Sequence, residues 1–137
     1  ASLRQVLADA GITPELARDH GLRIWKVGLA WPLDVEGARA FARGLQDVLV
    51  IEDRRAFLET QLQQALYALP DRPRIQGKHD GMGAPLLSEL TELDSAEITR
   101  ALVRFLPESL HTERLRARLA EITALEAEIV AMLGEVL

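Results

Sequence analysis

Cysteine is absent from this 137-residue chain, and aromatic residues make up only 4% of it. Without a thiol the chain can form no disulfide, no cysteine-ligated zinc site and no cysteine-ligated iron–sulfur cluster, and it has no thiolate nucleophile. The aromatic rings are too few for the stacking platform of a protein that binds single-stranded nucleic acid. These absences exclude several kinds of site before any motif is considered.

Positive charge and long apolar runs are also scarce. The formal net charge is -5, whereas nucleic-acid binders concentrate positive charge, so we expect no nucleic-acid partner. No run approaches the roughly 20 apolar residues that cross a bilayer, and no secretory signal pattern is present. We therefore expect no membrane contact and a cytoplasmic location.

With 48% hydrophobic and 27% charged residues, the composition is typical of a globular protein with one packed core.

The beginning of the chain indicates an internal fragment of a longer polypeptide. The first residue is Ala1 rather than methionine, and Ser2 leads directly into an amphipathic pattern. Ser2 is a good cap for a short first helix, which Gly11 would end. Thr13 and Pro14 then predict the start of a second helix, because proline is tolerated at the first helical position.

The next segments predict an α/β fold. The β-branched and aromatic segment 22–27 and the apolar run 47–51 predict two strands, with a helix over residues 35–45 between them. This order of elements is typical of a parallel, right-handed βαβ unit. A helix over residues 58–69 and a short third strand over residues 73–77 are predicted to follow.

The second half of the chain is predicted to be helical. Asp94 and Glu97 match a capping box ahead of an apolar helical pattern, which the next proline ends. Residues 110–133 contain neither glycine nor proline, and their apolar residues recur at steps of three and four, so we predict one long amphipathic helix. The sequence thus suggests an α/β domain over residues 1–107 and a C-terminal helix over residues 108–137.

The charged run Glu52-Asp53-Arg54-Arg55 directly follows the apolar run 47–51. Open α/β sheets bind ligands beyond the carboxyl ends of their strands, so one interpretation is a functional or interdomain contact. The other, which we favour, is that Glu52 and Asp53 cap the next helix at its positive end. In that case Arg54 and Arg55 are solvated.

The glycine-rich stretch of residues 77–83 invites comparison with a phosphate-binding loop. That motif needs a glycine five residues before Gly77, where Arg72 stands, and a serine or threonine after the lysine, where His79 stands. We therefore predict a plain flexible loop. Lys78 is the residue in it that we expect to contact a neighbour, and Asp80 lies two residues further on.

Neither a metal site nor a catalytic triad is predicted. His20, His79 and His111 lie in separate segments without the spacing that places two ligands on one helical face, and no serine occupies a nucleophile motif. We predict no catalytic, cofactor-binding or metal-binding residue in this chain. The candidate residues are those of a possible interface: Glu52, Asp53, Arg54, Arg55, Lys78 and Asp80.

Several segments in the same order resemble one family, the indolepyruvate ferredoxin oxidoreductases. Residues 21–33, GLRIWKVGLAWPL, resemble its stretch GIRLYKVGMPWPLE. Residues 48–55, VLVIEDRR, resemble ILVVEEKR, residues 61–67 resemble QLKEELY, and residues 74–80, RIQGKHD, resemble RVVGKFDE. Further similar pieces extend the resemblance over nearly the whole chain.

The resemblance implies a three-layer αβα fold with a small, mostly parallel sheet, like the C-terminal domain of transketolase. Its N-terminal strand would precede this chain, which would leave a sheet edge unpaired. For the parent enzyme the resemblance implies oxidative decarboxylation of arylpyruvates to acyl-CoA with thiamine diphosphate, Mg and 4Fe-4S clusters, and ferredoxin as electron acceptor. This region would be a non-catalytic domain that contacts other domains of the parent and helps to form a homodimer.

Two other hypotheses remain open. The chain could be a stand-alone α/β interaction module that pairs with a partner through its C-terminal helix. A small nucleotide-binding α/β protein is the third hypothesis, although it would need the phosphate-binding loop that is missing.

Overall fold

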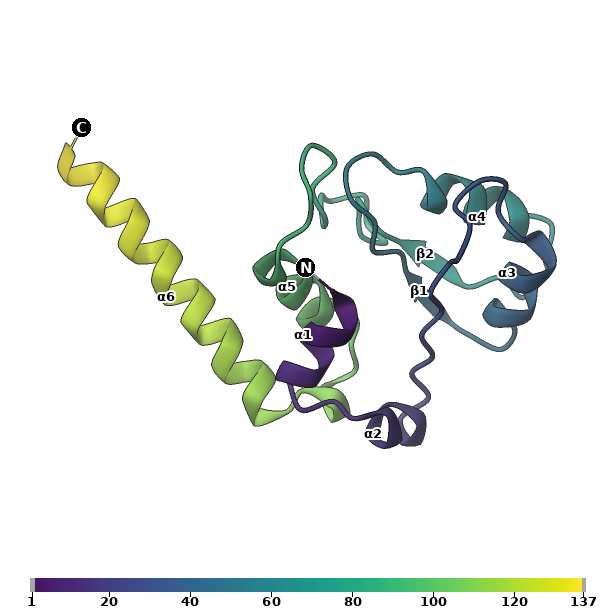
Figure 1. Cartoon of the computed structure of the whole chain (residues 1–137), viewed down its shortest axis with the longest axis horizontal. Coiled ribbons are helices and arrows are strands. Elements are labelled where there is room, and N and C mark those ends of the chain that lie inside the picture. Colours follow the sequence, from purple (N-terminus) through teal and green to yellow (C-terminus); the bar gives the residue numbers. More distant parts are fainter. Residues whose placement is uncertain (1, 137) are drawn as a thin grey trace. The chain divides into compact units, whose positions relative to one another are not determined.

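A computed structural model describes the backbone over residues 2–136 and the side chains as far as residue 126. The chain forms two compact units, and their elements are labelled in Figure 1. The helical unit consists of Ala1–Arg23 and Asp94–Leu137, and the sheet unit consists of Ile24–Leu93. The domain boundary near residue 107, which the sequence suggested, stays a prediction.

The sheet unit is built on a parallel βαβ arrangement. Strands β1 (Asp47–Leu49) and β2 (Arg74–Gln76) pair in parallel with Val48 opposite Ile75, and helix α4 (Leu58–Leu66) connects them. The third strand predicted from the sequence is thus confirmed as β2. The predicted α/β class with a small parallel sheet and a C-terminal helix is confirmed as well.

The core of the sheet unit lies between its helices and its strands. Helix α3 (Val35–Ala42) packs against α4, and α4 packs against β2. Asp34 begins α3, because its Oδ1 accepts a hydrogen bond from the backbone N–H of Gly37 at 3.0 Å. The buried residues that fill this core are Leu33, Ala38, Ala42, Val48, Leu62, Ala65 and Leu66.

The strand predicted over residues 22–27 is wrong. This segment has no regular secondary structure, and the sheet that the structure describes consists of β1 and β2. Trp25 and Val27 are instead half-buried against the core of the sheet unit, with the ring of Trp25 centred 5.5 Å from that of Phe41. Strand propensity reflects side-chain packing as much as backbone preference. The apolar side chains of this segment can therefore pack on the core although its backbone pairs with no strand. The observed βαβ unit therefore begins at β1, which is the second of the predicted strands.

The described part of the helical unit contains five helical elements. They are α1 (Leu3–Asp9), α2 (Pro14–Asp19), α5 (Ser95–Phe105), the 3-10 helix η1 (Glu108–Leu110) and α6 (Glu113–Val136). Helix α5 packs against both α1 and α6.

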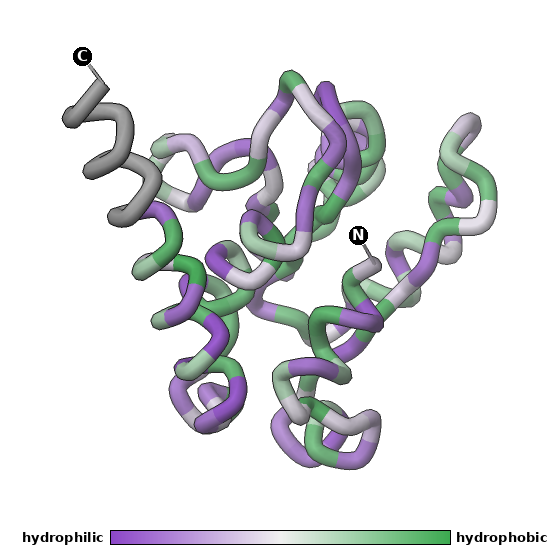
Figure 2. Tube along the Cα trace, turned by 60° about the vertical axis from the view of Figure 1, so that its left-hand side comes forward, coloured by the Kyte–Doolittle hydropathy of each residue, from purple (hydrophilic) through white to green (hydrophobic). Residues whose placement is uncertain are grey.

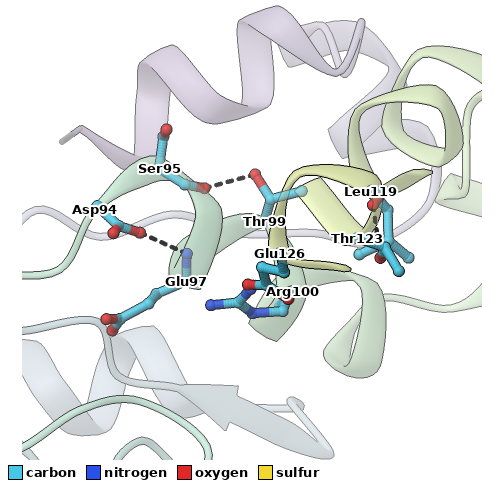
Figure 3. A network of polar contacts seen from close by, with 8 residues as sticks. All are labelled: Asp94, Ser95, Glu97, Thr99, Arg100, Leu119, Thr123 and Glu126. Carbon is cyan, nitrogen blue, oxygen red and sulfur yellow. Dashed lines mark hydrogen bonds and ion pairs between the residues drawn. The ribbon is translucent and has the colours of Figure 1, made fainter. Parts of the chain in front are cut away.

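Side-chain caps confirm the predicted helix starts. Ser2, Thr13 and Asp94 each accept a hydrogen bond from the backbone N–H three residues later, and Figure 3 shows the bond of Asp94. Gly11 follows α1 with a φ of 72°, a left-handed conformation that favours glycine and ends the helix.

Helix α6 is long and amphipathic over its described side chains, as predicted. Figure 2 shows hydrophilic and hydrophobic residues alternating along the coloured part of this helix. Leu115 and Ile122 are buried, whereas Leu125 is 56% exposed. Arg100 of α5 forms an ion pair with Glu126 of α6 (Figure 3). Ile129 and Met132, which the predicted apolar stripe includes, lie beyond the described side chains.

No helix in the described part of the chain is both long and apolar enough to span a bilayer.

Candidate functional site

All six candidate residues lie where the two strands leave the sheet. Because β1 and β2 are parallel, their carboxyl ends meet at the same edge. Residues 50–57 follow β1, and residues 77–92 follow β2. We call these two segments together the carboxyl edge.

Glu52 caps helix α4 from outside the helix. Its Oε1 accepts hydrogen bonds from the backbone N–H groups of Phe57 and Leu58 at 2.9 and 2.8 Å, and its Oε2 accepts one from Glu59 at 2.9 Å. Phe57 occupies the N-cap position but has no side-chain acceptor. The helix-capping interpretation is therefore confirmed for Glu52, whose negative charge also suits the positive end of the helix.

Asp53 has a different partner from the one expected. Its Oδ1 accepts a hydrogen bond from the backbone N–H of Leu93 at 2.8 Å, across 40 residues of chain. Asp53 therefore joins the segment after β1 to Leu93, the residue directly after the segment that follows β2. It stabilises the carboxyl edge rather than the start of α4.

Lys78 is an internal residue of this edge. Its side chain is only 2% exposed, and its Nζ donates hydrogen bonds to the backbone carbonyl of Glu52 and, at 2.9 Å, to that of Ser88. Its backbone N–H donates to Oε1 of Glu59 at 2.9 Å. We expected Lys78 to contact a neighbour, whereas here its ammonium group connects the two segments of the edge to each other.

Burial and negative charge act in opposite directions on this lysine. Burial lowers the pKa of Lys78 below the ordinary lysine value, because removal from water disfavours the ammonium form. The nearby carboxylates of Glu52, Asp53, Glu59 and Glu89 partly offset that lowering. The neighbouring carboxylates thus favour the charged form of Lys78, whereas its burial disfavours that form.

Glu59 is a residue of this site that the sequence reasoning missed. It is 8% exposed, although it belongs to the charged residues that are usually found at the surface. The signal was its spacing: Glu59 lies three and seven residues before Leu62 and Leu66, on the buried face of α4. A carboxylate on that face needs buried donors, and the backbone of Lys78 supplies one.

Arg54 and Arg55 are exposed, as predicted. Arg54 has a φ of 60°, and its backbone N–H donates to the carbonyl of Thr91 at 3.1 Å. Its guanidinium lies 3.6 Å from the carboxylate of Glu92, with side-chain exposures of 68% and 74%. Arg54, Arg55 and Glu92 are therefore presented to solvent, whereas Glu52 is half-buried.

Asp80 closes a hairpin turn. Its Oδ1 accepts hydrogen bonds from the backbone N–H groups of Met82 and Ala84 at 2.8 and 3.0 Å. His79 and Pro85 form an antiparallel bridge across the turn. The glycine-rich stretch is a loop, as predicted, and contains a hydrogen-bonded turn. The Asp80 carboxylate accepts donors of the type that a phosphate-binding loop would offer to an anion.

Gln61 attaches the segment before α3 to the start of α4. Its Nε2 donates to the carbonyl of Ala30 at 2.7 Å, and its Oε1 accepts from the backbone N–H of Leu33 at 3.0 Å. The rings of Trp31 and Phe57 then lie with their centroids 6.0 Å apart. Trp31 is 65% exposed and Phe57 49% exposed, so this aromatic pair is presented to solvent.

Further large apolar side chains are exposed near the aromatic pair or on the carboxyl edge. Leu29 lies just before the segment that Gln61 holds, Met82 lies in the hairpin turn, and Leu90 lies in the segment after β2.

The helical unit has an open depression of about 240 Å³. The two charged residues that line it already have partners. Asp9 Oδ1 accepts a hydrogen bond from Gln5 at 2.8 Å, and Arg118 lies 3.1 Å from Glu121. The other lining residues are Val6, Ala10, Ser95, Thr99 and Leu115.

Among the residues that the structure describes, no three histidine, aspartate or glutamate side chains are grouped so that they could hold a metal ion. His20 and His111 each have a ring nitrogen within 3.0 Å of a backbone carbonyl of their own segment. Their imidazoles are therefore placed by local helix-end contacts.

The fold and the site together define a small α/β domain whose polar groups at the carboxyl edge are bound largely to its own backbone. A comparison with family models matches residues 2–128 to the indolepyruvate oxidoreductase domain. The chain belongs to this family, which confirms the relationship indicated by the resembling segments. The chain matched none of the curated proteins and none of the solved structures with which it was compared.

Proposed function

We propose that this chain is a non-catalytic structural and interface domain of a thiamine diphosphate-dependent indolepyruvate:ferredoxin oxidoreductase. The parent enzyme would oxidatively decarboxylate arylpyruvates to acyl-CoA in the cytoplasm and pass the electrons to ferredoxin. The family match over residues 2–128 supports the connection to the oxidoreductase.

The observation that carries the non-catalytic role is the use of the polar groups at the carboxyl edge. Glu52, Asp53, Glu59 and Lys78 each contact backbone groups of the same unit. A general acid, a general base or a nucleophile must instead reach a substrate. In this arrangement the four side chains fix the two segments of the edge, which is the task of a scaffold.

The residues present do not fit the cofactors implied for the parent enzyme. The chain has no cysteine to ligate a 4Fe-4S cluster. A Mg-bound diphosphate needs free oxygen ligands, whereas the carboxylates of Glu52 and Glu59 accept backbone N–H groups and lie beside the Lys78 ammonium. No step of the reaction is therefore assigned to this chain.

Steady-state kinetics of the complete oxidoreductase test this role. Glu59→Gln keeps the Oε1 acceptor and removes the charge, so a folded variant should retain KM for the oxoacid and kcat within about twofold. Exposed Glu92→Gln is the matched control. Calorimetry of the chain with thiamine diphosphate and Mg²⁺ should show no binding. A Glu59→Gln enzyme with unchanged Tm but a kcat lowered more than about a hundredfold would contradict the proposal.

A stand-alone interaction module is the second candidate, and the exposure of Leu125 on α6 favours it. In that case α6 would pair with a partner helix through this side. Light scattering of the chain and of a variant that ends at residue 124, and therefore lacks Leu125, tests the idea. A mass that does not change on truncation would count against pairing through the removed part of α6.

A further inference from the structure

The part of the carboxyl edge that follows β2 has little internal support. The structure describes all of residues 77–92 and places no helix or strand among them, although His79 and Pro85 form an isolated bridge. Leu87 is the buried apolar side chain of this stretch, whereas Met82 is almost fully exposed. Segments with few buried apolar contacts open at a lower free energy than the core of a domain. We call residues 77–92 the strap.

Lys78 attaches the strap near its beginning. Its Nζ donates a hydrogen bond to the carbonyl of Glu52, in the segment after β1, and another at 2.9 Å to the carbonyl of Ser88, in the returning arm of the strap. One side chain therefore binds both arms of the strap and joins them to the rest of the carboxyl edge. Both bonds depend on the position of one nitrogen atom, so the two attachments are kept or lost together.

The end of the strap is attached to a strained backbone. Arg54 has a φ of 60°, a left-handed conformation that is unfavourable for a residue with a side chain, and its N–H donates to the carbonyl of Thr91 at 3.1 Å. The neighbouring Asp53 accepts the N–H of Leu93, directly after the strap. Strain of this kind persists only while the surrounding contacts maintain it. Opening of the strap would therefore release the strain at Arg54.

We propose that the strap opens as a unit while β1, β2, α3 and α4 stay folded, and that Lys78 is the residue that keeps it closed. In the open form the ammonium group of Lys78 and the carboxylate of Glu59, both buried in the closed form, become accessible at the carboxyl edge. The core of the sheet unit stays intact, because every buried residue of that core precedes the strap in the chain. The inference goes beyond the proposed structural role and does not rest on it.

Native-state hydrogen exchange of the whole chain, followed by NMR, tests the proposal. The amide of Leu86, which donates to the carbonyl of Lys78 at 2.8 Å, reports on the strap, and the amide of Ala65 in α4 reports on the core. We expect the Leu86 amide to be protected at least about tenfold less than that of Ala65, because opening the strap needs less free energy than unfolding α4. Equal protection would mean that the strap opens only when the whole unit unfolds, which overturns the proposal.

Two variants test whether Lys78 keeps the strap closed. Lys78→Met should speed exchange at Leu86 at least about tenfold, because its hydrogen bonds are among those that opening breaks. Leu66→Val is the control, since it removes a methylene group from the core, which stays packed in the open form. It should speed exchange at Ala65 and leave that at Leu86 unchanged. Equal acceleration at Leu86 in both variants would show one cooperative unit and overturn the proposal.

A milder variant covers the case in which Lys78→Met does not fold. Asp53→Ala removes an exposed acceptor and leaves the N–H of Leu93 without this bond, so exchange at Leu86 should rise about three- to tenfold. Asp9→Ala is the matched control, because Asp9 is also exposed and accepts its hydrogen bond from Gln5 in the helical unit. Exchange at Leu86 should not change there. The same Leu86 rate in the Asp53→Ala variant as in the wild type overturns the proposal.

Discussion

A side chain at Gly77 would collide with Glu59. A Cβ atom built at Gly77 lies 2.1 Å from Oε1 of Glu59 and 3.3 Å from the carbonyl oxygen of Val50. Glu59 cannot simply move away, because the same Oε1 accepts the hydrogen bond of the Lys78 backbone. The absence of a side chain at Gly77 is what allows a buried carboxylate to reach the end of β2.

Gly77→Ala should therefore lower the free energy of unfolding by about 1–3 kcal/mol, because either Glu59 or the backbone must shift. Urea denaturation measures this change. Gly81→Ala is the control, since a Cβ there meets nothing within 4 Å and the change should stay within about 1 kcal/mol of zero. Equal losses in the two variants would contradict the role of the close approach.

Lys78→Met should destabilise the chain by about 2 kcal/mol or more. The substitution leaves the carbonyls of Glu52 and Ser88 without their donor, and it removes the cation between neighbouring carboxylates. Lys26→Met is the matched control, because Lys26 is the other lysine of the chain and is exposed. We expect a change within about 0.5 kcal/mol there. Similar urea midpoints for the two variants would show that the buried hydrogen bonds do not contribute.

The effect of Lys78→Met should also depend on pH. Burial lowers the pKa of Lys78 below its ordinary value of 10.5. Between those two pKa values the unfolded chain binds more protons than the folded chain, so this group makes the free energy of unfolding rise with pH. The stability difference between the wild type and Lys78→Met should therefore increase as the pH approaches 10.5. A difference that falls over that range would contradict the lowered pKa.

Local sequence patterns were sufficient to predict much of the fold. Ser2, Thr13 and Asp94 cap helices because a short polar side chain reaches a backbone N–H only three residues away. The apolar run that contains β1 predicted a covered parallel strand. Residues 22–27 have the same strand propensity, but no strand lies next to them. A strand forms only beside another strand, and the local sequence does not show whether one is there.

The candidate site was predictable in position but not in its contacts. Glu52 was recognisable because it follows a strand and precedes a helix. The bonds from Glu59 to Lys78, across 19 residues, and from Gln61 to Ala30, across 31, depend on how the elements pack. The sequence predicted that Lys78 contacts a neighbour, but its burial depends on long-range contacts that a charged residue type does not reveal.

Glu52→Gln should weaken the start of α4. Both carboxylate oxygens accept backbone N–H groups, and an amide would place an NH₂ donor against one of those donors. We expect a loss of about 1–2 kcal/mol in the free energy of unfolding, measured by urea denaturation. Glu92→Gln removes an exposed partner of Arg54 and should change stability by less than about 1 kcal/mol. The capping role would be refuted if the two variants were equally stable.

Leu115→Ala and Leu125→Ala should separate the two sides of α6. Leu115 is fully buried in the helical unit, so its truncation leaves a cavity and should cost about 2–5 kcal/mol. Leu125 is more than half exposed, and its replacement by alanine should change stability by less than about 0.5 kcal/mol, since alanine also favours helix. Thermal unfolding of both variants at low protein concentration, where association does not contribute, measures the difference. A large loss for Leu125→Ala under these conditions would mean that the chain buries this side of α6 internally, and the exposed face would then no longer support pairing through the helix.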